Sequence, residues 1–233
     1  MADHERLSFK YEFEWQVNPY PGFFIVIEGL DGSGNSTQVD KLANQFFYDW
    51  EGITNKHIKV EKEPTYGPFG APVNYALRRG FRVDDRTLQL GFTADRSDHI
   101  VAGDISKHLT THGNILLMDR YVASTVAYGY ARGLNPDWLI ALQSTFFLPD
   151  LMFYLDASPA ICMERMRKRN PMAADLYEKE ETLQRAQEGY YYLIDEFPGL
   201  IQKIDGNDSI ANVYNKITAI IEKHPKQYGG RAV

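Results

Sequence analysis

Cysteine is almost missing from this chain, which has one, Cys162, among its 233 residues. A single cysteine excludes a disulfide within the chain, and such low usage is typical of a reducing compartment. Long apolar runs are missing too. A membrane-spanning helix needs about 18 apolar residues, and no apolar run in this chain approaches that length. The acidic N-terminal segment also lacks the apolar stretch found in secretory signals. We therefore expect a cytoplasmic protein with no membrane partner.

Positive charge is also in short supply. The chain has 31 Asp and Glu against 25 Lys and Arg, a formal net charge of −6. Because binding to DNA or RNA rests on neutralising many phosphates, this balance argues against a polymeric nucleic acid partner, whereas a small phosphorylated ligand needs only a local basic pocket. The 44% hydrophobic and 24% charged fractions are those of a globular protein, and the length suits one large α/β domain.

What the chain does contain is a glycine-rich loop between two regular elements. The apolar run 23–28 is typical of a buried strand, and apolar residues recur at helical spacing over 39–47. The glycines between them allow a tight turn whose N–H groups, with the positive end of the following helix, bind an anion. The spacing matches the phosphate loop G-x-x-x-x-G-K-[ST], except that Asn35 stands at the lysine position. The predicted ATP contacts are Gly29, Gly32, Ser33, Gly34, Asn35, Ser36 and Thr37.

Elsewhere, strand-like runs alternate with helical periodicity. The further predicted strands cover 57–63, 114–119, 151–156 and 200–204, and this alternation favours a mainly parallel sheet. We predict an α/β fold of the P-loop NTPase type, a doubly wound, mainly parallel five-stranded sheet flanked by helices. It spans residues 22–224, with a polar tail over 225–233.

The segment before this domain has its own pattern. Apolar and polar residues alternate between Leu7 and Val17, which is strand periodicity. We predict that residues 1–21 form an extension with an added strand. It either covers the core or presents an edge to a partner.

Charged residues stand where predicted strands end, at the edge where open α/β sheets bind ligands. Lys62 and Glu63 come just before Pro64, and Asp119 and Arg120 end another strand. A phosphoryl-transfer protein places a magnesium-linked carboxylate and a phosphate-binding arginine at such ends, although a solvated strand end has the same composition.

Two helical segments add candidates. Phe92 and Arg96 share a helix face and suit base stacking and phosphate binding, although a core ring and a surface arginine would give the same pattern. The basic run 165–169 precedes Pro171. It is either a solvated face or the start of a short basic lid over about 165–178 that closes on the transferring group.

In this order and at this spacing, the phosphate loop, the Lys62-Glu63-Pro64 and Asp119-Arg120-Tyr121 segments and the Phe92 to Arg96 motif resemble the thymidylate kinase family. The resemblance covers about residues 22–222. It implies transfer of the γ-phosphoryl group of ATP to thymidine monophosphate, with Mg²⁺, by a homodimer. Because the acceptor phosphate is already anionic, catalysis would be alignment and charge neutralisation, with no general-base histidine.

The resemblance also implies residue roles. Phe92 would stack on thymine, Tyr128 would disfavour a 2′-hydroxyl, and Lys62 stands where the family commonly has arginine. The implied metal contacts are Ser36 and Asp119, and the implied catalytic residues are Asp31, Arg120, Arg167 and Arg169. The implied substrate contacts are Asp31, Lys62, Glu63, Pro64, Phe92, Arg96, Arg120, Tyr121, Ser124, Thr125 and Tyr128.

Asn35 leaves three interpretations open. Losing one preorganised transition-state contact typically costs about 3–4 kcal/mol. The substitution is therefore inactivating in an otherwise active enzyme, compensated by lid arginines, or the mark of a nucleotide-binding protein without catalysis. A kinase for another nucleotide or deoxynucleoside is the alternative among enzymes.

Overall fold

The computed structural model describes residues 14–49, 57–79, 83–169 and 176–225. They form a sheet of five parallel strands in the order β2-β3-β1-β4-β5. The strands are β1 (Phe23–Gly29), β2 (Ile58–Lys62), β3 (Ile115–Asp119), β4 (Leu151–Asp156) and β5 (Gln202–Asp205). The predicted α/β fold with a doubly wound five-stranded sheet is confirmed, and every strand pair in this sheet is parallel.

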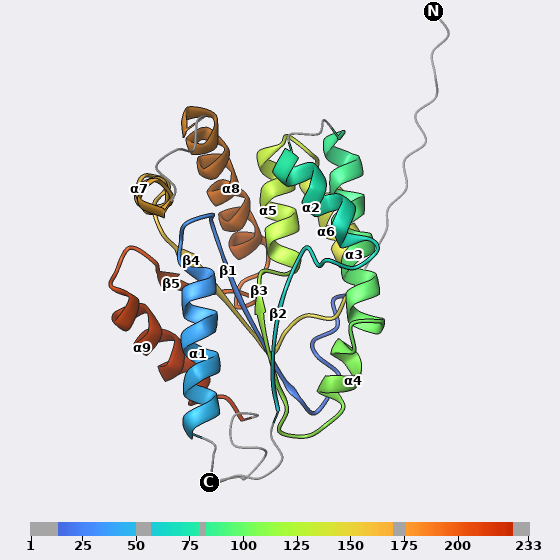
Figure 1. Ribbon diagram of the computed structural model, residues 1–233, viewed down its shortest axis with the longest axis vertical. Helices are drawn as coiled ribbons and strands as arrows, with labels where there is room; N and C mark the ends of the chain where they lie inside the picture. Colours follow the sequence, from blue (N-terminus) through green and yellow to red (C-terminus); the bar gives the residue numbers. More distant parts are fainter. Residues whose placement is uncertain (1–13, 50–56, 80–82, 170–175, 226–233) are drawn as a thin grey trace, which may run out of the picture.

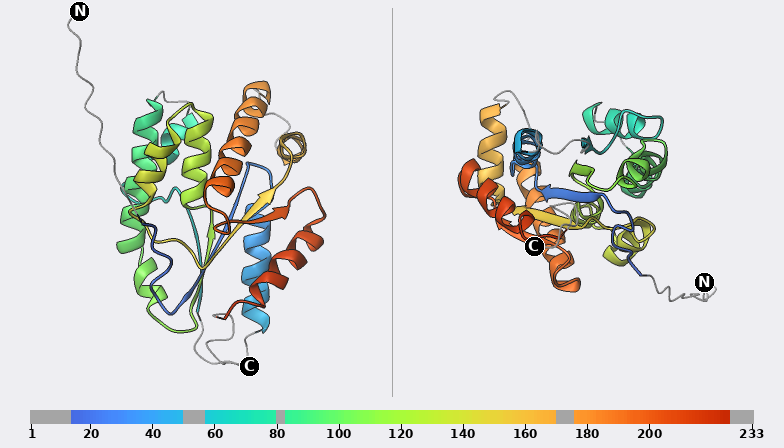
Figure 2. Two further views of the ribbon diagram at one scale, coloured as in Figure 1. Left: turned by 180° about the vertical axis from the view of Figure 1, so that it is seen from behind. Right: turned by 90° about the horizontal axis from the view of Figure 1, so that it is seen from below.

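Helices cover both faces of the sheet (Figure 1). One face carries α1 (Asn35–Asp49) and α9 (Ile210–Ile221), which pack together. The other face carries α3 (Asp85–Val101), α4 (Ile105–Leu109), α5 (Val122–Ala131), α6 (Pro136–Gln143) and α8 (Leu176–Glu196). Two further helices, α2 (Gly70–Arg79) beside α3 and α7 (Pro159–Arg169) beside α8, lie toward one end of the strands (Figures 1 and 2).

The central strand β1 supplies side chains to two cores. Successive side chains of a strand point to opposite faces. Phe24 and Val26 therefore join the cluster under α5 and α8, whereas Phe23, Ile25 and Ile27 join the cluster under α1 and α9. All seven residues of β1 are buried. The sheet thus holds its carboxyl edge rigidly between two packed layers.

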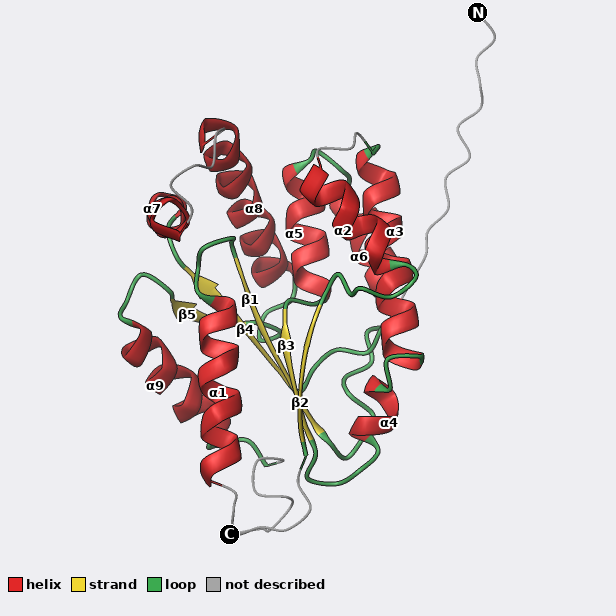
Figure 3. Ribbon diagram, in the orientation of Figure 1, coloured by secondary structure: helices red, strands yellow, loops and turns green. Residues whose placement is uncertain are grey.

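That carboxyl edge carries the candidate site. The phosphate loop follows β1, and the parallel register places Lys62 of β2 opposite Asp119 of β3 and Asp119 opposite Ile27 of β1. The loops that leave these strands lie at the upper ends of the strands in the view of Figure 3, below α7, α5 and α2.

Two helices were not predicted from the sequence. Gly70 and Pro72 look like loop residues, but both lie in the first turn of α2, where a missing N–H is harmless. Helix α4 has only 5 residues, too few to show helical periodicity in the sequence. No helix among the described residues has the length and apolar character needed to cross a membrane.

The predicted N-terminal strand lies largely outside the described residues. From residue 14 onward, the extension forms one parallel bridge, from Val17 to Leu148, and Trp15 Nε1 donates to the Gln143 carbonyl at 3.1 Å. An added strand over residues 1–13 stays a prediction.

Candidate active site

The phosphate loop forms the tight turn that its glycines predict. Gly32 has φ of 86° and Gly34 has φ of 110°, values that L side chains rarely adopt. A Cβ on Gly32 would lie 2.5 Å from the Cys162 carbonyl, so α7 packs directly on the loop. The loop ends at Asn35, the first residue of α1, so that its N–H groups and the helix N-terminus surround one anion-sized space.

Asn35 is buried inside this loop and bonds to it. In the amide orientation that satisfies both ends, Nδ2 donates to Ser33 Oγ at 2.7 Å and to the Glu28 carbonyl at 3.2 Å, while Oδ1 accepts from the Gly29 N–H at 3.2 Å. Both donor hydrogens of the amide are then used within the loop. Asn35 is therefore a structural brace for the loop and brings no charge to the phosphate space.

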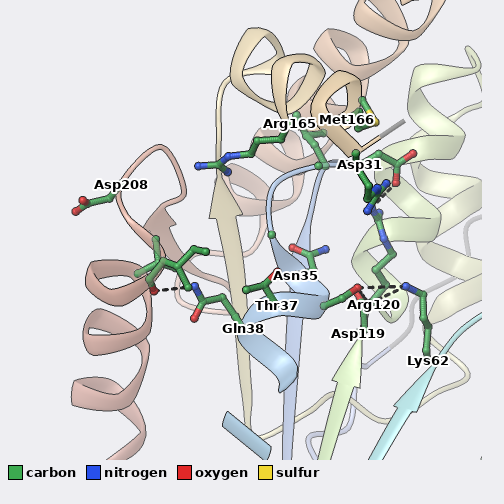
Figure 4. Close-up of a pocket in the computed structure, with 17 residues that line it drawn as sticks. Asp31, Asn35, Thr37, Gln38, Lys62, Asp119, Arg120, Arg165, Met166 and Asp208 are labelled. Carbon is green, nitrogen blue, oxygen red and sulfur yellow. Dashed lines mark hydrogen bonds and ion pairs between the residues drawn. The ribbon is translucent and has the colours of Figure 1, made fainter. Parts of the chain in front are cut away.

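The two predicted metal contacts lie together beside the loop. Ser36 Oγ donates to Asp119 Oδ2 at 2.5 Å, and Lys62 Nζ donates to the same oxygen at 2.8 Å (Figure 4). The described residues contain no cluster of three or more His, Cys, Asp or Glu suited to a metal. A hydroxyl and one carboxylate nevertheless fit Mg²⁺, which proteins bind through one or two carboxylates together with substrate phosphates.

These residues line a pocket of about 400 Å³, the phosphate pocket. Arg165 of α7 closes one wall, because its Nη1 donates to the Ser33 carbonyl at 2.9 Å and its Nη2 to the Gly206 carbonyl at 3.1 Å. Arg169 also lines the pocket, whereas Arg167 is exposed and is not among the lining residues. Of the predicted lid, residues 170–175 lie outside the described part of the chain.

Arg120 stands at the other wall. It has φ of 74°, in the left-handed region, which is strained for an arginine. Its Nη2 pairs with Asp31 Oδ1 at 2.7 Å, its Nη1 donates to Ser124 Oγ at 3.2 Å, and its guanidinium lies 5.1 Å over the Tyr128 ring. The Tyr128 hydroxyl in turn accepts from the Asp31 N–H at 2.9 Å. Burial raises the pKa of Tyr128 to about 12, so that its hydroxyl stays neutral.

A second pocket of about 280 Å³, the acceptor pocket, adjoins the first. Its lining includes all eleven predicted substrate contacts, namely Asp31, Lys62, Glu63, Pro64, Phe92, Arg96, Arg120, Tyr121, Ser124, Thr125 and Tyr128. Three of these, Asp31, Lys62 and Arg120, also line the phosphate pocket. The structure thus brings the predicted ATP and acceptor residues to one continuous site.

Two of the predicted substrate contacts are committed to protein partners. Arg96, 2% exposed, donates from Nε to Glu63 Oε2 at 2.8 Å, and its Nη2 lies 2.7 Å from the same oxygen in an ion pair. Its remaining donors contact Thr125 and Gln143. Neither Arg96 nor Glu63 presents a free charge to the phosphate pocket. The contacts of Arg96 and Glu63 instead fix the wall of the acceptor pocket and the orientation of Thr125.

His99 extends this buried network. Its Nδ1 lies 3.2 Å from Glu63 Oε1 and its Nε2 lies 3.2 Å from Glu61 Oε2. Burial lowers the pKa of His99, but the hydrogen bonds and charges of Glu63 and Glu61 outweigh burial and raise it above its ordinary value.

Three buried polar side chains near the site were missed from the sequence. Glu28 accepts from the Tyr121 N–H at 2.8 Å and from the Tyr190 hydroxyl at 3.1 Å, and burial raises its pKa. A carboxylate inside an apolar strand was the signal that could have identified it. Gln143 and Tyr190 carry no comparable signal, because they come from distant helices and meet the site only through the fold.

The chain was compared with known proteins. The family model described as "Thymidylate kinase" matches residues 27–217. A "Probable thymidylate kinase" of Thermococcus kodakarensis is 33% identical over 208 residues, which are 85% of this chain and 97% of that protein. A "Probable thymidylate kinase" of Staphylothermus marinus is 33% identical over 205 residues, covering 87% of this chain and 96% of that protein. The "Thymidylate kinase" of Dictyostelium discoideum is 32% identical over 207 residues, covering 88% of this chain and 87% of that protein. Together with the order of the motifs along the chain, these matches show that it belongs to the thymidylate kinase family.

Proposed function

We propose that this chain transfers the γ-phosphoryl group of ATP to thymidine monophosphate, giving ADP and thymidine diphosphate. Family membership supports a phosphotransferase that uses ATP. The single observation that carries the assignment to this site is the junction at Asp31, Lys62 and Arg120, which line both the phosphate pocket and the acceptor pocket. A phosphoryl group passing from one ligand to the other must cross that junction.

The transfer needs alignment and charge neutralisation. The bond from the γ-phosphorus to the β,γ-bridging oxygen breaks, and a bond from the same phosphorus to an acceptor phosphate oxygen forms, with the electron pair left on ADP. Backbone N–H groups from Gly32 to Thr37 hold the donor phosphates. Arg120, oriented by Asp31 and Ser124, holds the acceptor phosphate at the junction. Because the acceptor oxygen is already anionic, no side chain has to remove a proton.

We propose Ser36 and Asp119 as the protein contacts of Mg²⁺. Their oxygens meet at 2.5 Å beside the donor phosphates, and hard oxygen donors suit this ion. When bound, Mg²⁺ would supply charge neutralisation for the β- and γ-phosphates.

The acceptor pocket suits a pyrimidine deoxynucleotide. Phe92 is half-buried in its wall and offers a ring face for stacking. Thr125, held by Arg96, offers a hydroxyl for the base, and Tyr128 stands beside the space for the sugar. We propose these as thymine and deoxyribose contacts, with Pro64 and Tyr121 as apolar walls. Arg167 stays proposed as a catalytic residue only in a closed form of the lid, and Arg169 lines the pocket without closure.

A homodimer and a cytoplasmic location complete the proposal. The dimer rests on the family resemblance alone. The location rests on the single cysteine, which is buried.

A coupled ADP-release assay with ATP, Mg²⁺ and a panel of nucleoside monophosphates tests the proposal. We expect the highest kcat/KM with thymidine monophosphate and a loss with uridine monophosphate, because Tyr128 crowds a 2′-hydroxyl. A preference for another acceptor would assign the site to a different nucleotide kinase. Asn35 favours one second candidate, a nucleotide-binding protein without turnover; it predicts that ATP and thymidine monophosphate bind while neither this chain nor Asn35→Lys releases ADP.

A further inference from the structure

A phosphate loop without its lysine lacks the cation that normally reaches the β- and γ-phosphates. In this chain Asn35 cannot replace it even as a neutral donor, because both amide hydrogens bond within the loop. If the chain catalyses phosphoryl transfer, another cation has to lie beside the donor phosphates.

Three basic side chains near the loop are held elsewhere, and a fourth, Arg169, lines the phosphate pocket from the end of α7. Lys41, farther along α1, lies with its Nζ 5.1 Å over the Tyr214 ring of α9. Arg165 is tied to two backbone carbonyls. Arg120 pairs with Asp31 and lies at the acceptor wall.

Lys62 is placed differently. Its Nζ lies 2.8 Å from Asp119 Oδ2 and 3.5 Å from Ser36 Oγ, the hydroxyl next to Asn35 in the loop. In Figure 4 its side chain points toward Asp119 and the phosphate pocket. The Lys62 side chain is 60% exposed, so its ammonium can turn from Asp119 to a bound phosphate, while the buried Asp119 carboxylate keeps its hydrogen bond from Ser36 Oγ. Its position follows from the sheet, since the parallel register sets Lys62 of β2 directly opposite Asp119 of β3.

We propose that Lys62 takes over the role of the missing phosphate-loop lysine, so that its ammonium neutralises the β- and γ-phosphates of ATP. The inference rests on the proposed function, and it assigns Lys62 to the donor rather than to the acceptor. Lys62 stays protonated and forms no covalent bond during transfer. Its charge offsets the negative charge that gathers on the β,γ-bridging oxygen as the bond to the γ-phosphorus breaks.

The proposed magnesium contacts are compatible with this assignment, because Lys62 and Ser36 share one oxygen of Asp119. Asp119 Oδ2 is both the present partner of Lys62 and the proposed metal contact. If Asp119 held the metal, the Lys62 ammonium would lose this partner, and the donor phosphates would supply another. Lysine suits such a change, because its ammonium is a point charge on a flexible stem.

Four proteins test the inference: the unaltered chain, Lys62→Met, Asn35→Lys and the double variant. In the unaltered background we expect Lys62→Met to lower kcat by about 10²–10³-fold, the effect of losing one preorganised transition-state contact. We expect it to weaken binding of a fluorescent ATP analogue with Mg²⁺ at least tenfold. In the Asn35→Lys background the loop again has its own lysine. There, Lys62→Met should lower kcat less than tenfold and weaken binding of the ATP analogue less than threefold.

Lys59→Met is the matched control. Lys59 lies on the same strand, but its Nζ contacts Glu61 at 3.1 Å and the Gly103 carbonyl, away from both pockets. It should leave kcat and ATP binding unchanged.

Equal losses from Lys62→Met in both backgrounds would overturn the inference. A rise confined to KM for thymidine monophosphate would overturn it as well and would make Lys62 an acceptor contact. Failure of the proposed function is distinguishable: if no protein of the set phosphorylates thymidine monophosphate, the ATP-binding comparison still decides. In that case, unchanged ATP affinity in Lys62→Met would refute the donor role of Lys62. Loss of ATP affinity in Lys62→Met, with recovery in the double variant, would support it.

Discussion

Replacing Glu63 by alanine should destabilise the fold far more than a surface substitution does. The Glu63 and Arg96 side chains are 3% and 2% exposed, and a hydrogen bond of 2.8 Å and an ion-pair contact of 2.7 Å join them. Removing one partner of a buried ion pair typically costs about 3–5 kcal/mol, because the remaining charge is left without compensation. Arg96 keeps its contacts with Thr125 and Gln143, so we expect the lower end, about 3 kcal/mol.

Urea unfolding measures this loss directly. With an m-value of about 3 kcal/mol per molar, 3 kcal/mol lowers the midpoint by about 1 M. Glu61→Ala, two residues earlier in the chain, is the control, since Glu61 is 26% exposed and its pairs with Lys59 and His99 should contribute under about 1 kcal/mol. A midpoint for Glu63→Ala within about 0.3 M of the unaltered chain, at unchanged m, would refute the reasoning.

Three further outcomes follow from the site. The raised pKa of His99 contributes stability that is fully present below its ordinary value of 6.5 and is lost as pH rises through the folded-state value. The gap in urea midpoint between the unaltered chain and His99→Gln should therefore narrow from pH 5.5 to pH 9, and a constant gap would contradict this. In Gly34→Ala the added Cβ meets open space, but the residue has to keep a φ of 110°, which is strained for alanine. We expect about 1–2 kcal/mol of destabilisation, and weaker ATP binding measured by titration. Unchanged stability and ATP affinity would show that the loop relaxes freely. Tyr128→Phe keeps the ring over Arg120 but removes the hydroxyl that accepts from the Asp31 N–H. Losing this hydrogen bond should cost about 1 kcal/mol of binding and raise KM for thymidine monophosphate several-fold. An unaltered KM would exclude a role of the Tyr128 hydroxyl in acceptor binding.

Local patterns were enough to predict the sheet and the phosphate loop. The predicted strands at 23–28, 114–119 and 151–156 are short apolar runs, whereas those at 57–63 and 200–204 mix apolar and polar residues. The loop glycines Gly32 and Gly34 occupy backbone conformations that few other residues adopt. The acceptor wall was only partly predictable. Phe92 and Arg96 share a helix face as their spacing requires, but the partners of Arg96 come from the loop after β2, from α5 and from α6. No pattern within one segment encodes a contact among four segments.

The role of Asn35 shows the same limit more sharply. Compared with the motif, the loop lacks one positive charge. Within the fold, the Asn35 amide braces the end of β1 and the turn, and Lys62 of β2, two strands away, faces the same space. The position of that lysine depends on which strands are adjacent and on their register, neither of which a loop motif contains. The charge of a phosphate site therefore belongs to the carboxyl edge of the sheet as a whole. A substitution in the loop has to be judged against every side chain that this edge brings within reach of the phosphates.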